Sequence, residues 1–208
     1  MGQGDGRLMK LGLTGGVGSG KSTVAALLEA CGAGRFDADA VSRELTAAHG
    51  AAMPLIAQAF GAGVVAPDGS LDRAAMRERV FQDAQQRKRL ESILHPMIAE
   101  RREAFMQAWA GRSVVFDVPL LAESPAWRAR VDRIVVVDCL ESTQVARVMA
   151  RSGLSAADVQ SIMHTQATRA QRRAVADAVI YNEGLSLQDL EQVVQGLWAH
   201  WQGVPVKQ

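Results

Sequence analysis

A glycine-rich run followed by a lysine and two hydroxyl residues is the strongest chemical signal in this sequence. Residues 15–22 read GGVGSGKS and fit G-x-x-x-x-G-K-[ST], with an apolar run before them and a helix-like pattern after them. Glycines allow several backbone N–H groups to converge on one anion, and the positive end of the following helix adds to the attraction. The stretch therefore predicts a loop that binds the phosphates of a nucleoside triphosphate.

Within this loop we expect Lys21 to reach the β- and γ-phosphates and the Ser22 hydroxyl to ligate Mg²⁺. Thr23 is expected on the α-phosphate side. The predicted ATP-binding residues are Gly16, Val17, Gly18, Ser19, Gly20, Lys21, Ser22 and Thr23. A glycine turn without function is the alternative. GTPases, motor ATPases and small-molecule kinases share such a loop, so it does not identify the reaction by itself.

Two aspartates at the end of the next apolar run are candidates for acid–base chemistry. They are Asp37 and Asp39, with Arg43 one helical turn further on. The C-terminal ends of strands gather around the ligand in an α/β sheet, so an acid there can orient an acceptor hydroxyl and take its proton. We expect Asp39 to act in this way and Arg43 to bind an acceptor phosphate or pair with Asp39. The alternative is that both acids cap a helix.

A third acid, Asp117, ends the apolar stretch SVVFD. Its position resembles that of the aspartate that holds Mg²⁺, directly or through water, in other proteins with this loop. Asp117 is therefore predicted as a metal ligand together with Ser22. The segment DVPLLAE, which begins at Asp117, is also a candidate contact for the acceptor, so both roles stay open.

Arginines recur along the helical segment 141–173. Arg147 and Arg151 share one helical face, and Gln166, Arg169 and Arg173 share a face of the next helix. Two such helices joined near Gly153 would form a lid whose cations stabilise the triphosphate while water is excluded. The arginines considered for this role are Arg147, Arg151, Arg169 and Arg172. A solvated surface hairpin is the alternative.

Five short apolar runs are the expected strands that position these side chains. They are residues 8–14, 34–38, 113–118, 133–138 and 178–182. Uninterrupted apolar runs are typical of strands buried on both faces of a parallel sheet, and helical segments separate them here. The alternation predicts an α/β fold in three layers, with a five-stranded parallel sheet flanked by helices.

The segment between the second and third runs is far longer than an ordinary crossover and has a helical pattern. We interpret it as an inserted lobe, which commonly holds the second substrate beside a phosphate loop; a structural insertion is the alternative. The predicted organisation is a core of about 8–46, 112–140 and 174–204, a lobe of about 47–111 and a lid of about 141–173.

Apolar stripes along residues 90–109 and 187–201 predict two helices packed on a core, the first of them kinked or restarted at Pro96. Ser142 and Ser155 are predicted N-caps, and Gly153 is a predicted helix stop.

The composition excludes some classes of function. The chain has 208 residues, of which 48% are hydrophobic and 22% charged, and a net charge of +1, so nothing favours nucleic acid or an anionic membrane as a partner. No apolar run approaches the roughly 20 residues that span a bilayer, and MGQGDGRLMK lacks the apolar core of a signal peptide. We expect a cytoplasmic protein. The two cysteines lie far apart and predict neither a disulfide framework nor a metal site.

Taken together, the motifs resemble those of the dephospho-CoA kinase family. They occur in that family's order between Leu11 and Gly184, as LTGGVGSGKSTV, DADAVSREL, GSLDRAAMRERVFQD, LESILHPMI, DVPLLAE, RVMARSGLS and ADAVIYNEG. The phosphate loop alone is generic, whereas DAD, LHP and DVPLLAE in combination are specific. Phe36, where an aliphatic residue is usual, and a longer leader before Leu8 are small departures.

The resemblance implies transfer of the ATP γ-phosphate to the 3′-hydroxyl of the dephospho-CoA ribose, the last step of coenzyme A synthesis. It implies a fold like that of nucleoside monophosphate kinases, with a helical CoA-binding lobe and a lid. By position, Asp39 is then the catalytic base, Arg43 supports the acceptor or the transition state, and Arg147 comes from the lid. His95 lies in the His-Pro element on the substrate side, where it is either a substrate contact or a polar cap at the kink.

Three other interpretations stay open at this stage. Another kinase of the same architecture would act on a nucleoside, a nucleotide or a shikimate-like acceptor. A regulatory GTPase would need a guanine-reading N-K-x-D after a strand, and VVVDCLES and VIYNEGLS lack it. Nucleic-acid binding has little support from the near-zero net charge. The oligomeric state, monomer or small homo-oligomer, stays open too.

Overall fold

The structure, a computed structural model, describes residues 8–203. The predicted leader before Leu8 therefore lies outside the described residues. Contacts within the chain define two compact units, which we describe separately. Within the described residues, unit 1 comprises residues 8–36 and 111–203, and unit 2 comprises residues 37–110.

Unit 1 is built on a five-stranded sheet. The strands are β1 (Lys10–Gly15), β2 (Gly34–Asp37), β3 (Val114–Asp117), β4 (Arg133–Asp138) and β5 (Ala178–Tyr181). Their order is β2-β3-β1-β4-β5, and β1 pairs in parallel with β3 and β4, as β4 does with β5. All five predicted strands are confirmed within two residues at each end.

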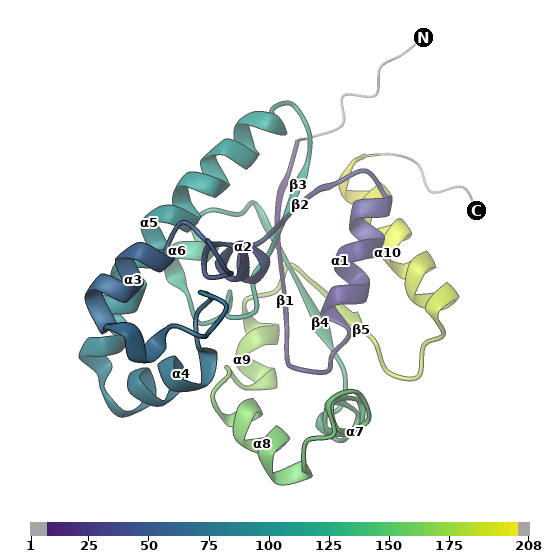
Figure 1. The fold of residues 1–208 in the computed structure, drawn as a ribbon. Helices are drawn as coiled ribbons and strands as arrows, with labels where there is room; N and C mark the ends of the chain where they lie inside the picture. The colour runs from purple at the N-terminus through teal and green to yellow at the C-terminus, as the bar shows by residue number, and fades with distance from the viewer. Residues whose placement is uncertain (1–7, 204–208) are drawn as a thin grey trace. The chain divides into compact units, whose positions relative to one another are not determined.

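One face of the sheet is covered by α1 (Lys21–Ala30) and α10 (Leu187–Trp201), which lie side by side (Figure 1). Leu11 and Leu13 of β1 pack there with Leu190 and Val194 of α10 in the main core. The predicted apolar stripe of α10 is only partly right, because Leu187 and Val193 are exposed.

The opposite face of the sheet packs against the segment after β3. Leu121 and Val131 lie against Gly12 of β1, where a side chain would overlap them. The Phe116 ring lies 5.6 Å from the Trp127 ring of the short helix α6 (Pro125–Arg128). With helices or loops on both faces, the predicted three-layer α/β fold is confirmed.

The segment predicted as a two-helix hairpin contains three helices, α7 (Glu141–Ser152), α8 (Ala156–His164) and α9 (Arg169–Ala174). Gly153 ends α7 with φ of 69°, and Ser155 caps α8 by a reciprocal bond with Asp158, both as predicted. The predicted cap at Ser142 is wrong, because α7 begins one residue earlier and its N-cap is Leu140.

Unit 2 is helical. Its elements are α2 (Ala38–Leu45), α3 (Met53–Phe60), the 3₁₀ turn η1 (Ala62–Val64), α4 (Arg73–Gln82) and α5 (Ala84–Ala108). Its own core contains Ile56, Phe60, Val64 and Met76, with apolar residues of α5 packed against them. Pro96 lies inside an uninterrupted α5, so the predicted restart of the helix at this residue is wrong.

The described helices and the two cysteines also bear on the sequence predictions. None of the described helices is long and apolar enough to cross a membrane. Cys139 is buried and Cys31 is half-buried, both as free thiols, and burial raises the pKa of each. A raised thiol pKa leaves little reactive thiolate at neutral pH.

Candidate active site

The glycine-rich loop joins the carboxyl end of β1 to the first turn of α1. Gly18 and Gly20 have φ of 76° and 94°, which a side chain would strain, and a side chain at Gly20 would also overlap the Asn182 amide. The Ser19 N–H donates to the Gly16 carbonyl at 3.0 Å, which closes a tight turn over Val17 and Gly18. The sequence therefore needs glycine here for both backbone angle and space.

The turn leaves a set of donors at the start of α1. Among the described residues, no group accepts a hydrogen bond from the N–H groups of Gly18, Gly20, Lys21 or Ser22, and no side chain caps the helix at Gly20. Unpaired N–H groups at a helix N-terminus attract anions, and the helix dipole adds to the effect. The loop thus fits an anion such as the phosphates of a nucleotide.

Lys21 is held by a buried carboxylate. Its ammonium donates to Oδ1 of Asp117, and the Arg35 guanidinium donates to Oδ2 of the same carboxylate at 2.7 Å. Asp117 is only 1% exposed, and pairing with two cations offsets the cost of burying its charge. Three residues from β2, β3 and α1 thereby meet at the carboxyl end of the sheet.

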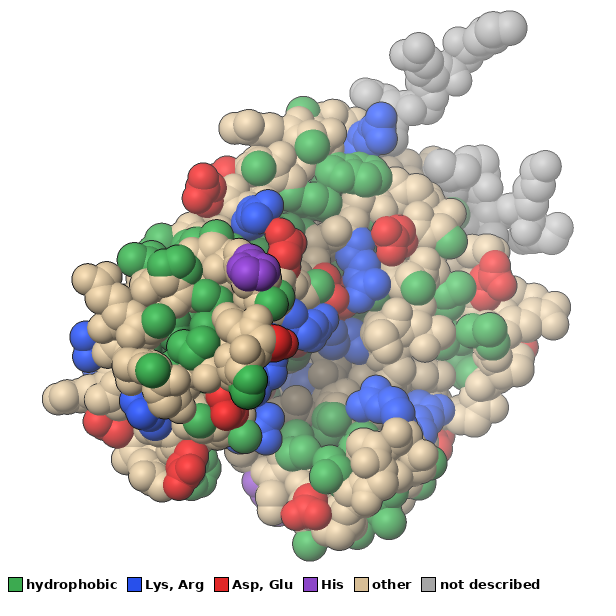
Figure 2. Space-filling model, in the orientation of Figure 1, with side chains coloured by type: hydrophobic (Ala, Val, Ile, Leu, Met, Phe, Trp, Pro, Cys, Tyr) green, Lys and Arg blue, Asp and Glu red, His purple; other side chains and the backbone are tan. Residues whose placement is uncertain are grey.

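Arg147 of α7 lies against the phosphate loop. Its guanidinium donates to the Asn182 carbonyl at 3.1 Å and to the Ser19 carbonyl at 3.4 Å, and the Asn182 side chain donates to Ser19 as well. Arg151, one turn further along α7, is exposed. Basic side chains are visible on the surface around α7 in Figure 2, where acidic and basic groups are otherwise interspersed.

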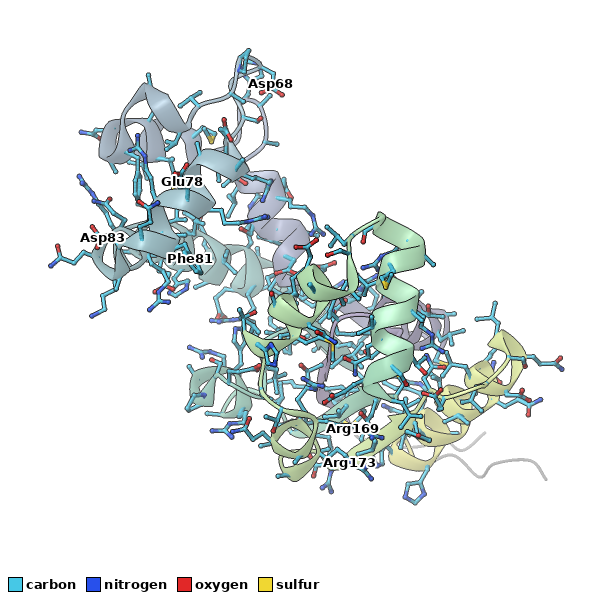
Figure 3. All side chains as sticks on the ribbon, turned by 90° about the horizontal axis from the view of Figure 1, so that it is seen from below. Asp68, Glu78, Phe81, Asp83, Arg169 and Arg173 are labelled. Carbon is cyan, nitrogen blue, oxygen red and sulfur yellow. The ribbon has the colours of Figure 1, made fainter. Side chains whose placement is uncertain are left out.

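Arg169, considered above as a lid cation, is paired with a buried aspartate. Its Nε lies 2.8 and 2.9 Å from the two carboxylate oxygens of the buried Asp138, and its guanidinium stacks over Tyr181. The hydrogen bond to Asp138 raises the pKa of Arg169, so it stays charged. Arg173, from the same helix, lies 3.7 Å from Asp138 (Figure 3).

Arg172 is likewise committed to the fold. It is 5% exposed, and its Nη1 donates to the Ala167 carbonyl. Burial lowers the pKa of this guanidinium from its very high ordinary value. The Arg169 side chain is 26% exposed, and Nη2 of Arg172 lies against Gly16 of the phosphate loop. The lid role of these two arginines stays a prediction.

All the predicted acceptor residues except Asp117, which lies in unit 1, belong to unit 2. Asp37, at the end of β2, caps α2 by accepting the Ala40 N–H at 2.8 Å, so capping is its observed role. Asp39 lies in the first turn of α2 and is exposed. Arg43 comes within 3.9 Å of Asp37, not of Asp39 as one alternative had it. His95 is exposed in the middle of α5 and therefore caps no helix end.

The structure allows a test of the predicted metal ligands. The described residues contain no group of three His, Cys, Asp or Glu side chains placed to hold an ion. A phosphate-loop Mg²⁺ does not need one, because a hydroxyl, phosphate oxygens and waters complete its shell. The exposed Ser22 hydroxyl fits that role, whereas both oxygens of Asp117 already bind cations.

Several residues at this site were not singled out by their sequence pattern. Arg35 is a cation within a strand, and a charge in an apolar run was the one signal that could have found it. Asn182, Gln144 and Glu123 gave no signal, because their contacts join segments far apart in the sequence. Gln144 is fully buried in α7, and neither atom of its amide has a partner among the described residues.

Comparison with known proteins identifies the family to which this chain belongs. A model of the family described as "CoaE: Dephospho-CoA kinase" matches residues 9–188. The chain belongs to the dephospho-CoA kinase family. A protein named dephospho-CoA kinase from Burkholderia thailandensis is 50% identical over 196 residues, which cover 94% of this chain and 97% of the relative.

Solved structures agree with the fold. TT1252 from Thermus thermophilus has a TM-score of 0.81 and 34% identity, covering 93% of this chain and 97% of that one. A dephospho-CoA kinase from Campylobacter jejuni has a TM-score of 0.62 over 93% and 97% of the two chains; at 19% identity it supports the fold alone. This dephospho-CoA kinase family member is accordingly a phosphotransferase of the phosphate-loop class, and a regulatory GTPase is no longer a competing interpretation.

Proposed function

We propose that this chain transfers the γ-phosphoryl group of ATP to the 3′-hydroxyl of dephospho-CoA, with residues 16–23 as the ATP site. The observation that carries the proposal is a complete phosphate loop in a chain that matches the dephospho-CoA kinase family over residues 9–188. Family membership supports the acceptor, and the donors at the start of α1 support the triphosphate end.

At the triphosphate end, the loop N–H groups without an acceptor would bind the phosphates, and Lys21 would reach the β- and γ-phosphates. The Lys21 ammonium now pairs with Asp117, which also holds Arg35. Since Arg35 stays paired with Asp117, Lys21 can exchange this partner for a phosphate oxygen without leaving the carboxylate unpaired. Asp117 thereby keeps Lys21 pointed along the sheet edge before ATP binds.

Mg²⁺ would neutralise charge on the β- and γ-phosphates. The Ser22 hydroxyl would ligate it directly. Asp117 would contribute directly or through a water molecule, since Arg35 would still hold one of its oxygens after Lys21 has turned to a phosphate.

At the acceptor end, Asp39 would orient the ribose hydroxyl and accept its proton. Its neighbour Asp37 caps α2, whereas Asp39 lies exposed in the first turn of that helix. We propose that Arg43 binds an acceptor phosphate and that His95, exposed on α5, contacts the substrate. The helical unit 2 would then hold the bulk of dephospho-CoA.

Arg147 would stabilise charge on the phosphoryl group as it transfers. Its guanidinium already lies on the Ser19 carbonyl, within the phosphate loop. A cation placed beforehand at the position of developing charge needs little reorganisation during the reaction.

The remaining proposals concern partners and location. We propose that the protein acts in the cytoplasm on small molecules, as a monomer or small homo-oligomer, with neither nucleic acid nor membrane as a partner. The net charge of +1 supports this.

A panel of acceptors tests the substrate. With ATP and Mg²⁺, ADP release should be rapid with dephospho-CoA and near background with a nucleoside monophosphate, shikimate or gluconate. A preference for any of these over dephospho-CoA would contradict the proposed acceptor. A matched assay with GTP in place of ATP tests the donor.

A further inference from the structure

The tip of the phosphate loop is held from outside by a glutamine. The turn closed by Ser19 and Gly16 places Val17 and Gly18 at its centre. Unlike the loop N–H groups that have no acceptor among the described residues, the Val17 N–H donates to Oε1 of Gln166 at 3.0 Å. Gln166 lies between α8 and α9, 149 residues further along the chain. One donor of the loop is therefore satisfied by a side chain.

The segment that carries Gln166 is itself fixed on its other side. The next residue, Ala167, donates its N–H to Oε1 of Glu123 at 2.5 Å and accepts a bond from the buried Arg172 through its carbonyl. Glu123 belongs to the segment DVPLLAE that follows β3. The joint between α8 and α9 is thus bonded to the loop after β1 and to the segment after β3.

The side chains of Arg172 and Gln144 lie against the same part of the loop. A side chain at Gly16 would overlap Nη2 of Arg172 and the amide of Gln144, so both lie directly against this residue. Gln144 is fully buried and its amide has no partner among the described residues, so it contacts the loop without bonding it. The hydrogen bond that Val17 donates to Gln166 is therefore the directional contact that orients the Val17 peptide.

We propose that Gln166 is a positioning residue for ATP binding: it fixes the turn Gly16–Ser19 through the Val17 N–H, and Glu123 acts through it by holding the α8–α9 joint. The proposal rests on the proposed function only in that the loop binds ATP; it does not depend on the acceptor. Gln166 touches neither reacting group, so its loss should weaken ATP binding and leave the chemical step nearly unchanged.

The first experiment compares Gln166→Met with Gln160→Met. Methionine keeps the length of the side chain and removes the acceptor, and Gln160 is an exposed residue of α8 in the same segment. In Gln166→Met, the Val17 amide should exchange with solvent about fivefold faster by NMR, and the ATP dissociation constant by calorimetry should rise about fivefold, the value of one neutral hydrogen bond. Gln160→Met should change neither.

A conservative variant separates the effect of the hydrogen bond to Val17 from the effect of the size and shape of the Gln166 side chain. Gln166→Glu keeps an acceptor oxygen, so it should restore slow exchange at Val17, although its charge makes ATP affinity uninformative. Glu123→Ala should weaken ATP binding less than Gln166→Met, and the double variant should be no weaker than Gln166→Met alone, because Glu123 acts through Gln166.

Unchanged Val17 exchange and ATP affinity in a folded Gln166→Met protein would overturn the proposal, as would tighter ATP binding. If the losses of ATP affinity in the double variant were additive, Glu123 would not act through Gln166. If Gln166→Met does not fold, Glu123→Ala, at an exposed residue, carries the test, and unchanged exchange at Val17 in that variant counts against the proposal. A wild-type protein that fails to bind ATP at all would contradict the proposed function instead.

Discussion

At the scale of single residues, the phosphate loop depends on glycines that cannot carry a side chain. Gly20 has φ of 94° and sits against Asn182, whose amide donates to Ser19 in the same loop at 2.8 Å. Gly196, in the middle of α10, has no atom within 4 Å of the position a side chain would take. The two glycines therefore form a matched pair for testing what the loop requires.

Gly20→Ala should abolish measurable ATP binding and destabilise the protein by about 1–3 kcal/mol through backbone strain and overlap with Asn182. Gly196→Ala should leave ATP binding unchanged and stabilise α10 by about 0.5–1 kcal/mol. Calorimetry with ATP and urea unfolding measure both effects. Equal behaviour of the two variants would contradict the account of the loop.

Asp39 carries the proposed acid–base step. Asp39→Asn keeps the size of the side chain and removes the base, so kcat should fall by at least about 100-fold while ATP affinity changes little. Asp37→Asn is the control, since an asparagine still caps α2 and should leave kcat within a small factor. Steady-state kinetics of the two variants decide between them, and near-normal turnover in Asp39→Asn would remove it from the role of base.

Residue roles were predicted from the sequence where a motif fixed both type and spacing. GGVGSGKS predicted the loop, and Lys21 stands at the head of α1 as expected. The partners of Arg169 and Arg172 could not be predicted, because a row of arginines on a helical face looks the same whether it faces solvent or a buried acid such as Asp138. Their contacts are tertiary and leave no local pattern.

At the scale of elements, α10 is held by only part of its apolar stripe. Leu190 is 4% exposed in the core with α1 and the sheet, whereas Leu187, one turn earlier, is 65% exposed. Leu190→Ala should lower the free energy of unfolding by about 2–5 kcal/mol. Leu187→Ala should change it by no more than about 0.5 kcal/mol, as measured in urea. Similar losses in both would mean that Leu187 is buried in solution.

The start of α7 is tied to the loop after β5 by a carboxylate. Glu183 accepts hydrogen bonds from the Thr143 hydroxyl at 2.6 Å and the Leu140 N–H at 2.9 Å, and these bonds lower its pKa below the ordinary 4.5. Because the folded pKa is depressed, the contact is fully present above pH 4.5 and is lost as the pH falls through the folded value.

The protection of the Leu140 amide against exchange, relative to its intrinsic rate at each pH, should therefore fall as the pH drops below 4.5. In Glu183→Gln, which cannot ionise, this extra pH dependence should disappear while the start of α7 exchanges faster at neutral pH. A wild-type profile in the variant would show that the Glu183 carboxylate does not hold α7.

Elements were predictable to the extent that they have local signals. Uninterrupted apolar runs located all five strands, and Gly153 located the end of α7. The break between α8 and α9 was missed, although Thr168 and Gln171 form a capping box that is readable as T-x-x-Q. The continuity of α5 through Pro96 could not be predicted, because the packing of unit 2 decides whether a helix survives a proline.

At the scale of the whole molecule, ATP binding should stabilise the folded chain. A ligand at about 100 times its dissociation constant adds about 2.7 kcal/mol to the free energy of unfolding, which corresponds to about 5–10 °C in the melting temperature for a chain of this size. Lys21→Met should fold normally, because Arg35 still pairs with Asp117, and should lose most of this shift. Scanning calorimetry with and without ATP tests both points, and a full shift in Lys21→Met would contradict its role.

The fold class and the family followed from motif order along the chain, since both depend on patterns that persist over many residues. The division at residue 37 separates the loop, Lys21, Asp117 and Arg147 from Asp39, Arg43 and His95. The chain thus carries its candidate phosphate-donor residues on one unit and its candidate acceptor residues on the other.

The central claim is that these two sets of residues serve one transfer reaction. The most direct measurement incubates the protein with ATP, Mg²⁺ and dephospho-CoA and identifies the products by mass spectrometry and ³¹P NMR. The account predicts ADP and CoA in equal amounts, with the new phosphate on the ribose 3′-hydroxyl. ADP and free phosphate without CoA, or a phosphate at another position, would contradict it.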